Sequence, residues 1–560
     1  MTSALPFTLR SEGDGVRLAL GNLEAIANLR VDLELEVPGD TAGTQVPATD
    51  IVQRYQRRRT RLGALAVRVD QRALDLHVAT RAAALAAEGY ADVRARIGEG
   101  DISVTARVAD GLASADVSFQ IVAVARGGAV RLLATAVRVH GHLPTPGPLL
   151  AHRVLELALE ARAPVSPGAS SPGLEGADRV TVIGLCEVEL DAITAILWRL
   201  LPAAGWRLPA VHGVGVVGLR ATKGTVVVSY GPGASGELAT SAAARQLALA
   251  HEAMRSADEL VKKGMLDEAM RGYRALLAAA GPDQPALLER ILGIAAARPS
   301  WFADGLELAR QALARWPDYP AAHAALASIA LAKGDTTEAA ARLVALSDVS
   351  ARVGDAGAAA LAGLAAGRLL RVLDPAGSTS LYARVLAHWP DHAEGGESLA
   401  ERLTDEKRFA ELALMLEARA RATKDPVRAA RDWARAAVLR AETLGDRVPA
   451  AADAANAVAL VADATSLAAQ ARVAAAAGEL AAAAAAWIDA ERAAADAGDD
   501  AGRIDARAAR AEVLDRGDDN ALALAAWQDA LALAPESARL LRGGAAAAAR
   551  AGDQATAIER

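Results

Sequence analysis

The feature that most constrains the fold is a pattern that recurs every 34 to 40 residues from about residue 240 to the end of the chain. Each copy places a glycine, a small residue, an aromatic residue and a second small residue at fixed offsets. Two copies are Gly264, Ala269, Tyr273 and Leu276, where leucine replaces the second small residue, and Gly478, Ala483, Trp487 and Ala490. The glycine suits a turn, and small residues let paired helices approach closely. The pattern therefore predicts a stack of helix pairs.

Further copies support the same register. In residues 316–340, Pro317 ends one helix, Leu326 packs, Gly334 turns the chain and Ala339 packs again. Residues 381–392 repeat part of this motif. A later copy, with one extra residue after Gly517, consists of Ala523, Trp527, Ala530 and Pro535. The regions 345–375 and 440–470 fit less well, so the pattern indicates about eight repeats.

This pattern resembles the tetratricopeptide repeat (TPR), which implies an all-α superhelical solenoid over residues 237–560. The resemblance implies a non-enzymatic scaffold whose concave surface binds a protein or a peptide. The inner positions that carry Lys, Arg and Asn in the peptide-binding members of the family are largely alanine here. The alternative is a solenoid that serves only as a spacer or an oligomerisation surface.

The few aromatic residues of the repeats are expected to fill gaps between helix pairs. Such residues are core side chains rather than surfaces that stack on a ligand. They are Tyr273, Tyr382, Trp487 and Trp527.

The last repeat is cut off in this register. Gly552 and Ala557 take the turn and packing positions, and the aromatic position falls one residue beyond Arg560. Solenoids usually finish with a polar capping helix. We therefore expect the natural chain to continue.

The first part of the chain follows a different pattern. Alternation of apolar and polar residues predicts strands at 16–20, 29–37, 65–69, 74–78, 102–108 and 117–125, with helices at about 79–96 and 148–162. Residues 1–162 are therefore a strand-rich α+β module. Residues 163–177, rich in Pro, Gly and Ser, are a linker or loop. Residues 178–236 are a small α+β segment, with strands at 178–185 and 224–230 and a helix at 191–204, that completes the module or stands alone.

Composition narrows the class of protein. A chain of 560 residues is too long to fold around a single hydrophobic core, so we expect a multidomain protein. Its net charge of −7 provides no basic footprint for nucleic acid. One cysteine cannot form an internal disulfide, and the chain shows neither a signal peptide nor a transmembrane segment. We expect a soluble, cytoplasmic protein, and the preference for Ala and Arg over Lys suggests a GC-rich bacterial genome.

Two glycine motifs match the phosphate-binding spacing GxGxxG. Gly213, Gly215 and Gly218 lead into further strand, which indicates a hairpin. Gly231, Gly233 and Gly236 follow a strand and precede a helix, the context in which backbone N–H groups hold phosphate. No second parallel strand follows to complete a dinucleotide fold. The second motif is therefore interpreted as a domain junction.

Other candidates for chemistry are few. His140 and His142 would share one face of a strand and, with His152, could bind zinc, but no carboxylate or cysteine cluster accompanies them. Cys186 has no basic neighbour in the sequence, which favours a buried structural thiol over a nucleophile. We find no catalytic motif, and we assign no catalytic, cofactor-binding or metal-binding residue. An enzyme that uses either the histidines or the second glycine motif is the least favoured interpretation.

One basic cluster could contact anionic lipid or phosphate, or could be a solvated helix face. It consists of Arg54, Arg57, Arg58, Arg59 and Arg61.

The order of strands and helices in residues 1–162 resembles, in pattern only, the tubular lipid-binding (TULIP) superfamily. This resemblance implies a lipid or another apolar ligand in a hollow module. The alternative is a filled core, with both halves of the chain binding proteins. The sequence leaves open which of the two holds.

Overall fold

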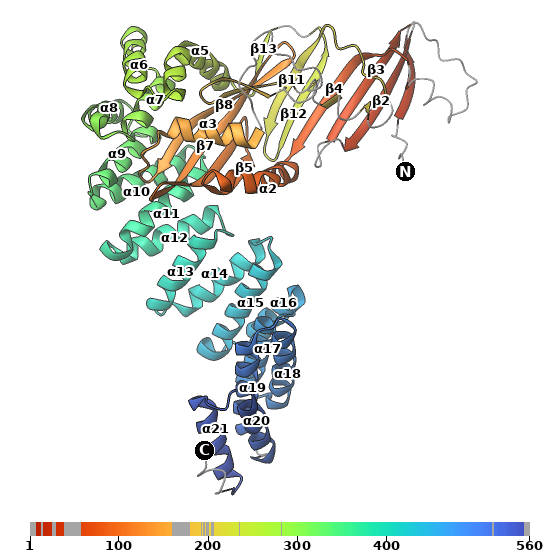
Figure 1. The fold of residues 1–560 in the computed structure, drawn as a ribbon, viewed down its shortest axis with the longest axis vertical. Helices are drawn as coiled ribbons and strands as arrows, with labels where there is room; N and C mark the ends of the chain where they lie inside the picture. Colours follow the sequence, from red (N-terminus) through yellow and green to blue (C-terminus); the bar gives the residue numbers. More distant parts are fainter. Residues whose placement is uncertain are drawn as a thin grey trace. The chain divides into compact units, whose positions relative to one another are not determined.

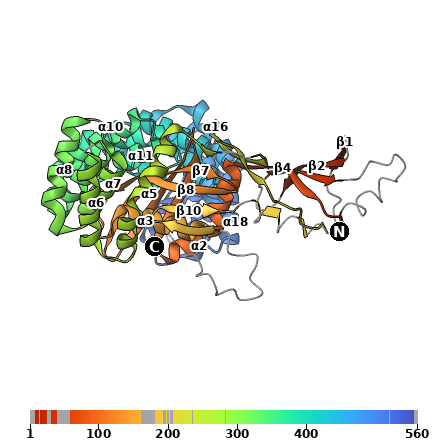
Figure 2. The ribbon, with the colours of Figure 1, turned by 90° about the horizontal axis from the view of Figure 1, so that it is seen from above.

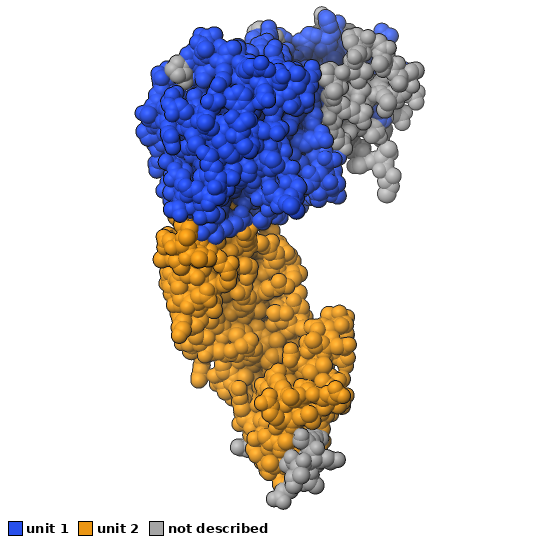
Figure 3. Space-filling model, turned by 60° about the vertical axis from the view of Figure 1, so that its left-hand side comes forward, with its two compact units in different colours: residues 1–369 blue, residues 370–560 orange. Residues whose placement is uncertain are grey.

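The computed structural model describes residues 7–12, 15–24, 30–38, 56, 58–159, 180–191, 193, 196–197, 201–202, 206–233, 236–281, 283–517 and 520–553. The chain divides into two compact units, residues 1–369 and residues 370–560 (Figure 3). Unit 1 is an α+β assembly, and unit 2 is all helical. The predicted class, a strand-rich module followed by an α-helical repeat region, is confirmed.

The first sheet is antiparallel throughout and has the strand order β1-β2-β3-β4-β12-β11. Its strands are β1 (Phe7–Glu12), β2 (Gly15–Glu24), β3 (Arg30–Pro38), β4 (Arg61–Asp70), β11 (Val214–Thr222) and β12 (Thr225–Pro232). Alternate residues of β3, such as Leu33 and Leu35, are fully buried in a core that also contains Trp206 and Tyr230. Because β12 pairs with β4, the segment 178–236 contributes to this sheet rather than standing alone.

The second sheet has the order β5-β6-β7-β8-β10-β9, with β13 also pairing with β7. Its strands are β5 (Tyr90–Ile97), β6 (Ile102–Asp110), β7 (Ala113–Arg126), β8 (Ala129–His140), β9 (Val180–Gly184), β10 (Glu187–Leu190) and β13 (Glu237–Ala239). The helix α2 (Gln71–Ala87) contacts β5, and α3 (Gly147–Leu159) contacts β8 and β10.

Two local predictions in this region are wrong. Residues 74–78, which alternate like a strand, lie inside α2. The Asp70 side chain accepts a hydrogen bond from the Ala73 N–H at 2.8 Å and starts this helix, which buries only Ala73 and Leu85. The predicted helix at 79–96 ends at Ala87, because residues 90–97 pair with β6 as strand β5. Most of the predicted helix at 191–204 lies outside the described residues.

From residue 242 onward the described chain consists of consecutive helices. In unit 1 they are α5 (Ala242–Lys262), α6 (Leu266–Ala280), α7 (Pro285–Ala295), α8 (Phe302–Arg315), α9 (Pro320–Ala332), α10 (Thr336–Arg352) and α11 (Ala356–Leu373), whose last turn belongs to unit 2. In unit 2 they are α12 (Pro375–His388), α13 (Ala393–Asp405), α14 (Phe409–Ala422), α15 (Pro426–Leu439), α16 (Arg447–Leu460), α17 (Ala464–Ala477), α18 (Leu480–Asp496), α19 (Asp500–Asp515), α20 (Asn520–Leu533) and α21 (Ala538–Arg550). The described helices from α5 to α20 form eight pairs in chain order.

The predicted repeat register is confirmed at the turns and in the core. Gly264, Gly334 and Gly478 adopt φ of 75°, 78° and 85° between the two helices of their pairs, a conformation that favours glycine. The small residues five positions later are fully buried; they are Ala269, Ala339 and Ala483. The predicted core aromatics are buried as well, with exposed fractions of 0% for Tyr273, 2% for Tyr382, 9% for Trp487 and 3% for Trp527. Ala557 lies outside the described residues.

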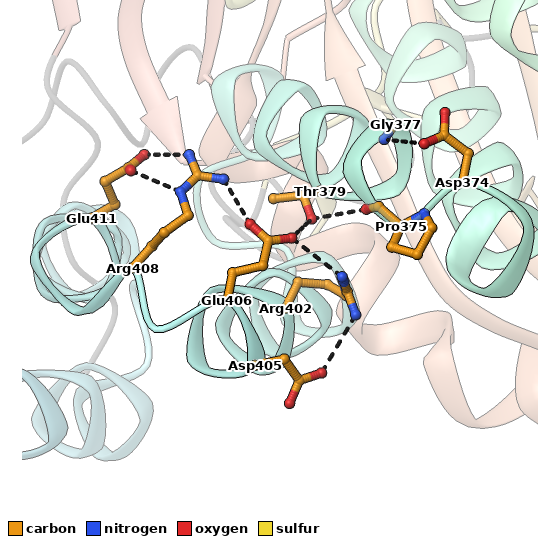
Figure 4. Close-up of polar contacts among 9 residues, drawn as sticks. All are labelled: Asp374, Pro375, Gly377, Thr379, Arg402, Asp405, Glu406, Arg408 and Glu411. Atoms are coloured by element: carbon orange, nitrogen blue, oxygen red, sulfur yellow. Dashed lines mark hydrogen bonds and ion pairs between the residues drawn. The ribbon is translucent and has the colours of Figure 1, made fainter.

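The pair α13–α14 turns without glycine. Lys407 takes the left-handed conformation there, with φ of 57°. A polar cluster around Glu406 holds this turn (Figure 4). The Glu406 carboxylate accepts hydrogen bonds from Thr379 of α12 at 2.7 Å, from Arg402 of α13 at 3.2 Å and from Arg408 at 2.8 Å. Hydrogen bonds from Arg408 and Thr379 lower the pKa of Glu406, so the carboxylate is ionised and joins α12, α13 and the residue that precedes α14.

One described helix is long and apolar enough to cross a membrane by length and composition, with 18 residues and a mean hydropathy of 1.4. This helix is α11, and 56% of it is buried inside the protein. Its Arg368 donates a hydrogen bond to Asp116 of β7 at 2.9 Å. Within unit 1, α11 therefore packs as a core helix.

Candidate functional site

In unit 1 the first helix of each pair faces the second sheet. The helices α5 and α7 contact β7 and β8 respectively, and α9 contacts β8 (Figures 1 and 2). At the start of α11, a side chain added at Gly357 would meet Thr105 and Ser103 of β6. The second sheet thus covers one face of α5, α7, α9 and α11.

A buried ion pair and two hydrogen bonds to Glu289 hold this sheet against the helices. Arg138 of β8 donates to Asp355, which precedes α11, at 2.5 Å, and both side chains are buried. Glu289 of α7 accepts hydrogen bonds from Thr135 Oγ1 at 3.4 Å and from the Ala136 N–H at 3.2 Å. Removing one partner of a buried pair leaves an uncompensated charge, which costs about 3–5 kcal/mol. These contacts therefore oppose separation of the sheet from the helices.

Cys186 belongs to the same interface, and its prediction as a buried structural thiol is confirmed. It is fully buried, and its Sγ lies 3.0 Å from the Pro148 carbonyl oxygen and 3.3 Å from Arg290 Nη1. Burial raises the pKa of the thiol, although the Arg290 guanidinium opposes this shift. The sequence shows no basic neighbour because Arg290 lies 104 residues further along the chain.

The three candidate histidines do not converge. His140 ends β8, so His142 is no longer on that strand, and the expected shared face is not formed. The His140 Nε2 pairs with Ser118 Oγ at 2.8 Å, and His142 Nδ1 with Ser328 Oγ at 3.2 Å. His152 lies 3.5 Å from Glu156. Within the described ranges, no group of three or more His, Cys, Asp or Glu residues is placed to hold a metal ion.

His140 lies at the end of a strand, but its side chain is not solvated. Its side chain is 2% exposed. Burial, together with the Arg138 and Arg368 guanidinium groups, lowers its pKa to about 3. The imidazole is therefore neutral in the folded protein at neutral pH.

The glycine motifs are structural. Gly213 has a φ of 78° and precedes β11, in which Gly215 and Gly218 pair with β12, so the predicted hairpin is confirmed. In the second motif, Gly231 belongs to β12, and Gly236 is followed by strand β13 rather than by a helix. The next helix, α5, begins at Ala242, and the Ser241 side chain accepts a hydrogen bond from the Ala244 N–H at 3.1 Å.

Only part of the basic cluster is described. Arg58 and Arg59 are exposed and do not belong to a helix, and Arg61 begins β4. The solvated helix face is thus not formed at these three residues. Arg54 and Arg57 lie outside the described residues.

The strands that suggested a lipid-binding module bury their apolar side chains against one another. Leu33, Leu35 and Leu65 are at most 1% exposed and form one packed core with Trp206 and Tyr230. In the part of the first sheet that the structure describes, this arrangement is that of a filled core. Lipid binding is an expectation that no described feature supports.

A groove with a volume of about 620 Å³ lies in unit 2. Three first helices line it: α15 with Ala434 and Val438, α17 with Ala464 and Ala468, and α19 with Ala506. The expectation that such inner positions are largely alanine holds only in part, because Arg435, Arg472 and Asp505 of the same helices also line the groove. A second hollow of about 370 Å³ shares Glu442, Arg472, Trp487 and Asp505 with the first, so the two are continuous. We refer to the first as the α15–α19 groove.

A π-helical turn shapes one wall of the α15–α19 groove. It covers Arg440–Leu444 and places Glu442 and Thr443 in the lining. Glu442 accepts a two-pronged contact from Arg472 of α17, at 2.7 Å to Nε and 2.5 Å to Nη2. Turns of this kind often occur at functional sites.

Charged pairs recur along the groove from one repeat to the next. Arg435 donates to Glu397 at 2.9 Å, and Arg539 to Glu512 at 2.7 Å and to Asp505 at 3.3 Å. The Glu397 carboxylate also accepts a hydrogen bond from Arg419. Burial opposes ionisation of this carboxylate, but the two guanidinium groups hold its pKa below the usual range. These residues were not predicted from the sequence. Their signal is an arginine that recurs 37 residues apart at positions 435 and 472.

Trp487 has two roles. It is buried between helices, as predicted, and its remaining surface lines both hollows. The prediction that the repeat aromatics are core residues is therefore confirmed, while Trp487 also contributes to the groove.

Comparison with solved structures finds helical-repeat proteins. The Cut9–Hcn1 hetero-tetramer of the APC/C matches with 15% identity and a TM-score of 0.25, over 52% of this chain and 55% of that chain. The C-terminal part of a TPR repeat-containing protein from Cytophaga hutchinsonii matches with 17% identity and a TM-score of 0.26, over 52% of this chain and 98% of that chain. No protein-family model matches the chain, and no curated protein matches it.

Proposed function

We propose that this protein is a non-enzymatic interaction scaffold that binds an extended segment of a partner protein in the α15–α19 groove. The observation that carries the proposal is the contrast between equivalent helices. The sheet covers α5, α7, α9 and α11, whereas α15, α17 and α19 line an open groove of about 620 Å³.

The lining of the groove suits a polypeptide backbone. Ala434, Ala464 and Ala468 have short side chains, so a chain can approach the helices closely. Val438, which is half-buried, adds apolar surface. The ion pairs at the rim are exposed, and exposed pairs contribute little to stability, so they are free to serve specificity.

The strand-rich part of unit 1 has a structural role in this proposal. Its second sheet occupies the binding face of the first repeats and thereby confines partner binding to unit 2. A spacer or an oligomerisation surface is the alternative, and the experiment below separates it from the scaffold.

Site-specific photo-crosslinking tests the proposal. A photoreactive amino acid replaces Thr465, an exposed groove residue of α17, in the full-length chain in cells. The matched control carries it at Ala485, an exposed residue of α18 that is not part of the groove lining. We expect a discrete heterologous adduct from position 465 and none from position 485.

A bulky substitution completes the test. Thr465→Trp should fill the groove and remove the adduct from a crosslinker placed at Thr443, while Ala485→Trp should leave it unchanged. Adducts that form equally at both positions, or only between copies of this chain, would refute the proposal.

A further inference from the structure

The charge of the chain is distributed unevenly. Residues 1–369 contain 38 Lys and Arg and 38 Asp and Glu, and so are neutral. Residues 370–560 contain 23 Lys and Arg and 30 Asp and Glu, and so carry the whole net charge of −7. Within them, residues 440–560 contain 12 basic and 19 acidic residues. The excess negative charge therefore belongs to the repeats that include α17 and α19.

The arginines of the α15–α19 groove are already neutralised. Arg435 is paired with Glu397 and Arg472 with both carboxylate oxygens of Glu442. Neither guanidinium is left to attract an acidic ligand. A carboxylate-binding clamp is thus not what this groove provides.

Two carboxylates on the α19 side of the groove, Asp499 and Asp505, are exposed and less neutralised than these arginines. Asp499 is exposed and lines the groove, and its carboxylate accepts a hydrogen bond from the Gly502 N–H at 2.9 Å. Among the described residues it has no cationic partner. Asp505 lines the same wall with 74% of its side chain exposed, and shares a 3.3 Å contact with Arg539. Arg516 lines only the neighbouring hollow, so it does not offset these charges in the groove.

We propose that the α15–α19 groove selects a basic segment, in which Lys or Arg side chains meet Asp499 and Asp505 while apolar side chains lie on the alanine floor. This inference rests on the proposed function and adds the chemistry of the partner to it. Complementary charge steers association and excludes partners of the wrong sign.

The test uses fluorescence anisotropy on the full-length chain with two labelled twelve-residue probes. One repeats Lys-Ala-Leu and the other repeats Glu-Ala-Leu. We expect the basic probe to bind more tightly than the acidic probe and to lose affinity as salt rises.

Charge-removing variants then locate the binding. Asp499→Asn keeps the oxygen that caps α19, and Asp505→Asn keeps the side-chain volume. We expect the double variant to weaken the basic probe at least about threefold, the effect of two exposed ion pairs. Asp500→Asn removes the same charge from the next residue, which is not part of the groove lining, and should leave affinity unchanged.

The outcomes separate this inference from the proposed function. An acidic probe that binds as tightly, absence of binding by the basic probe, or an equal loss in Asp500→Asn would overturn the basic preference. If binding of the acidic probe is nevertheless abolished by Thr465→Trp, the groove remains a binding site of different chemistry. If a probe binds and Thr465→Trp changes nothing, the proposed groove function fails as well.

Discussion

Gly543 of α21 offers a direct test of how the last described repeats pack. Alanine usually stabilises a helix relative to glycine, but at this position we expect it to destabilise the protein. Alanine normally stabilises a helix by about 0.5–1 kcal/mol relative to glycine. A Cβ at position 543, however, would lie 2.5 Å from Cζ2 and Cζ3 of Trp527. Displacing the indole ring of Trp527 would cost free energy, because the ring is 3% exposed and its Nε1 donates a hydrogen bond to Asp515 at 3.0 Å. We expect Gly543→Ala to destabilise α20 and α21 by about 1–3 kcal/mol, the usual cost of overpacking.

Hydrogen–deuterium exchange followed by mass spectrometry is the appropriate assay, because it reports the opening free energy of individual helices. Ala546→Gly, at an exposed position of the same helix, calibrates the propensity term and should cost about 0.5–1 kcal/mol.

The background of Trp527→Ala provides the decisive comparison. That substitution alone should cost about 3–5 kcal/mol, since it empties a buried site. With the ring absent, Gly543→Ala should become stabilising, so the sign of its effect should reverse between the two backgrounds. A stabilising effect of Gly543→Ala in the wild-type chain would refute the packing of Trp527 against α21.

Three further outcomes follow from unit 1 and unit 2. A Cβ at Gly396 would lie 2.8 Å from the Cδ of the buried Arg419. Gly396→Ala should therefore displace the guanidinium from its buried partner Asp432. We expect the free energy of unfolding, measured with urea, to decrease by about 3–5 kcal/mol. Burial and two guanidinium groups hold the pKa of His140 at about 3 instead of 6.5. As the pH falls, the imidazole therefore binds a proton in the unfolded chain before it does so in the folded protein. The free energy of unfolding should decrease between pH 6.5 and 3 by up to about 1.4 kcal/mol per pH unit. Replacing His140 with Gln should reduce this dependence, and an unchanged dependence would contradict the burial of His140. Lys407→Gly should raise the unfolding midpoint by relieving a left-handed conformation worth about 1 kcal/mol, and no change would contradict the described turn.

The sequence by itself determined the elements whose cause is local. The alanines and aromatics of the repeat sit in the core because their spacing follows the helical period, and Gly264 and Gly478 mark turns because the left-handed conformation favours glycine. Residues 74–78 show the limit of this reasoning. Their alternation matches a strand, but the Asp70 cap makes them part of α2.

Only the tertiary structure decided which repeats are open. The contacts of Arg138 with Asp355 and of Cys186 with Arg290 join residues more than 100 positions apart, and no local period encodes them. These buried contacts couple the sheet to α7 and α11, which closes the face of the first repeats. The α15–α19 groove depends likewise on side chains from successive repeats, such as Glu442 and Arg472, whose pairing exists only once the helices have stacked.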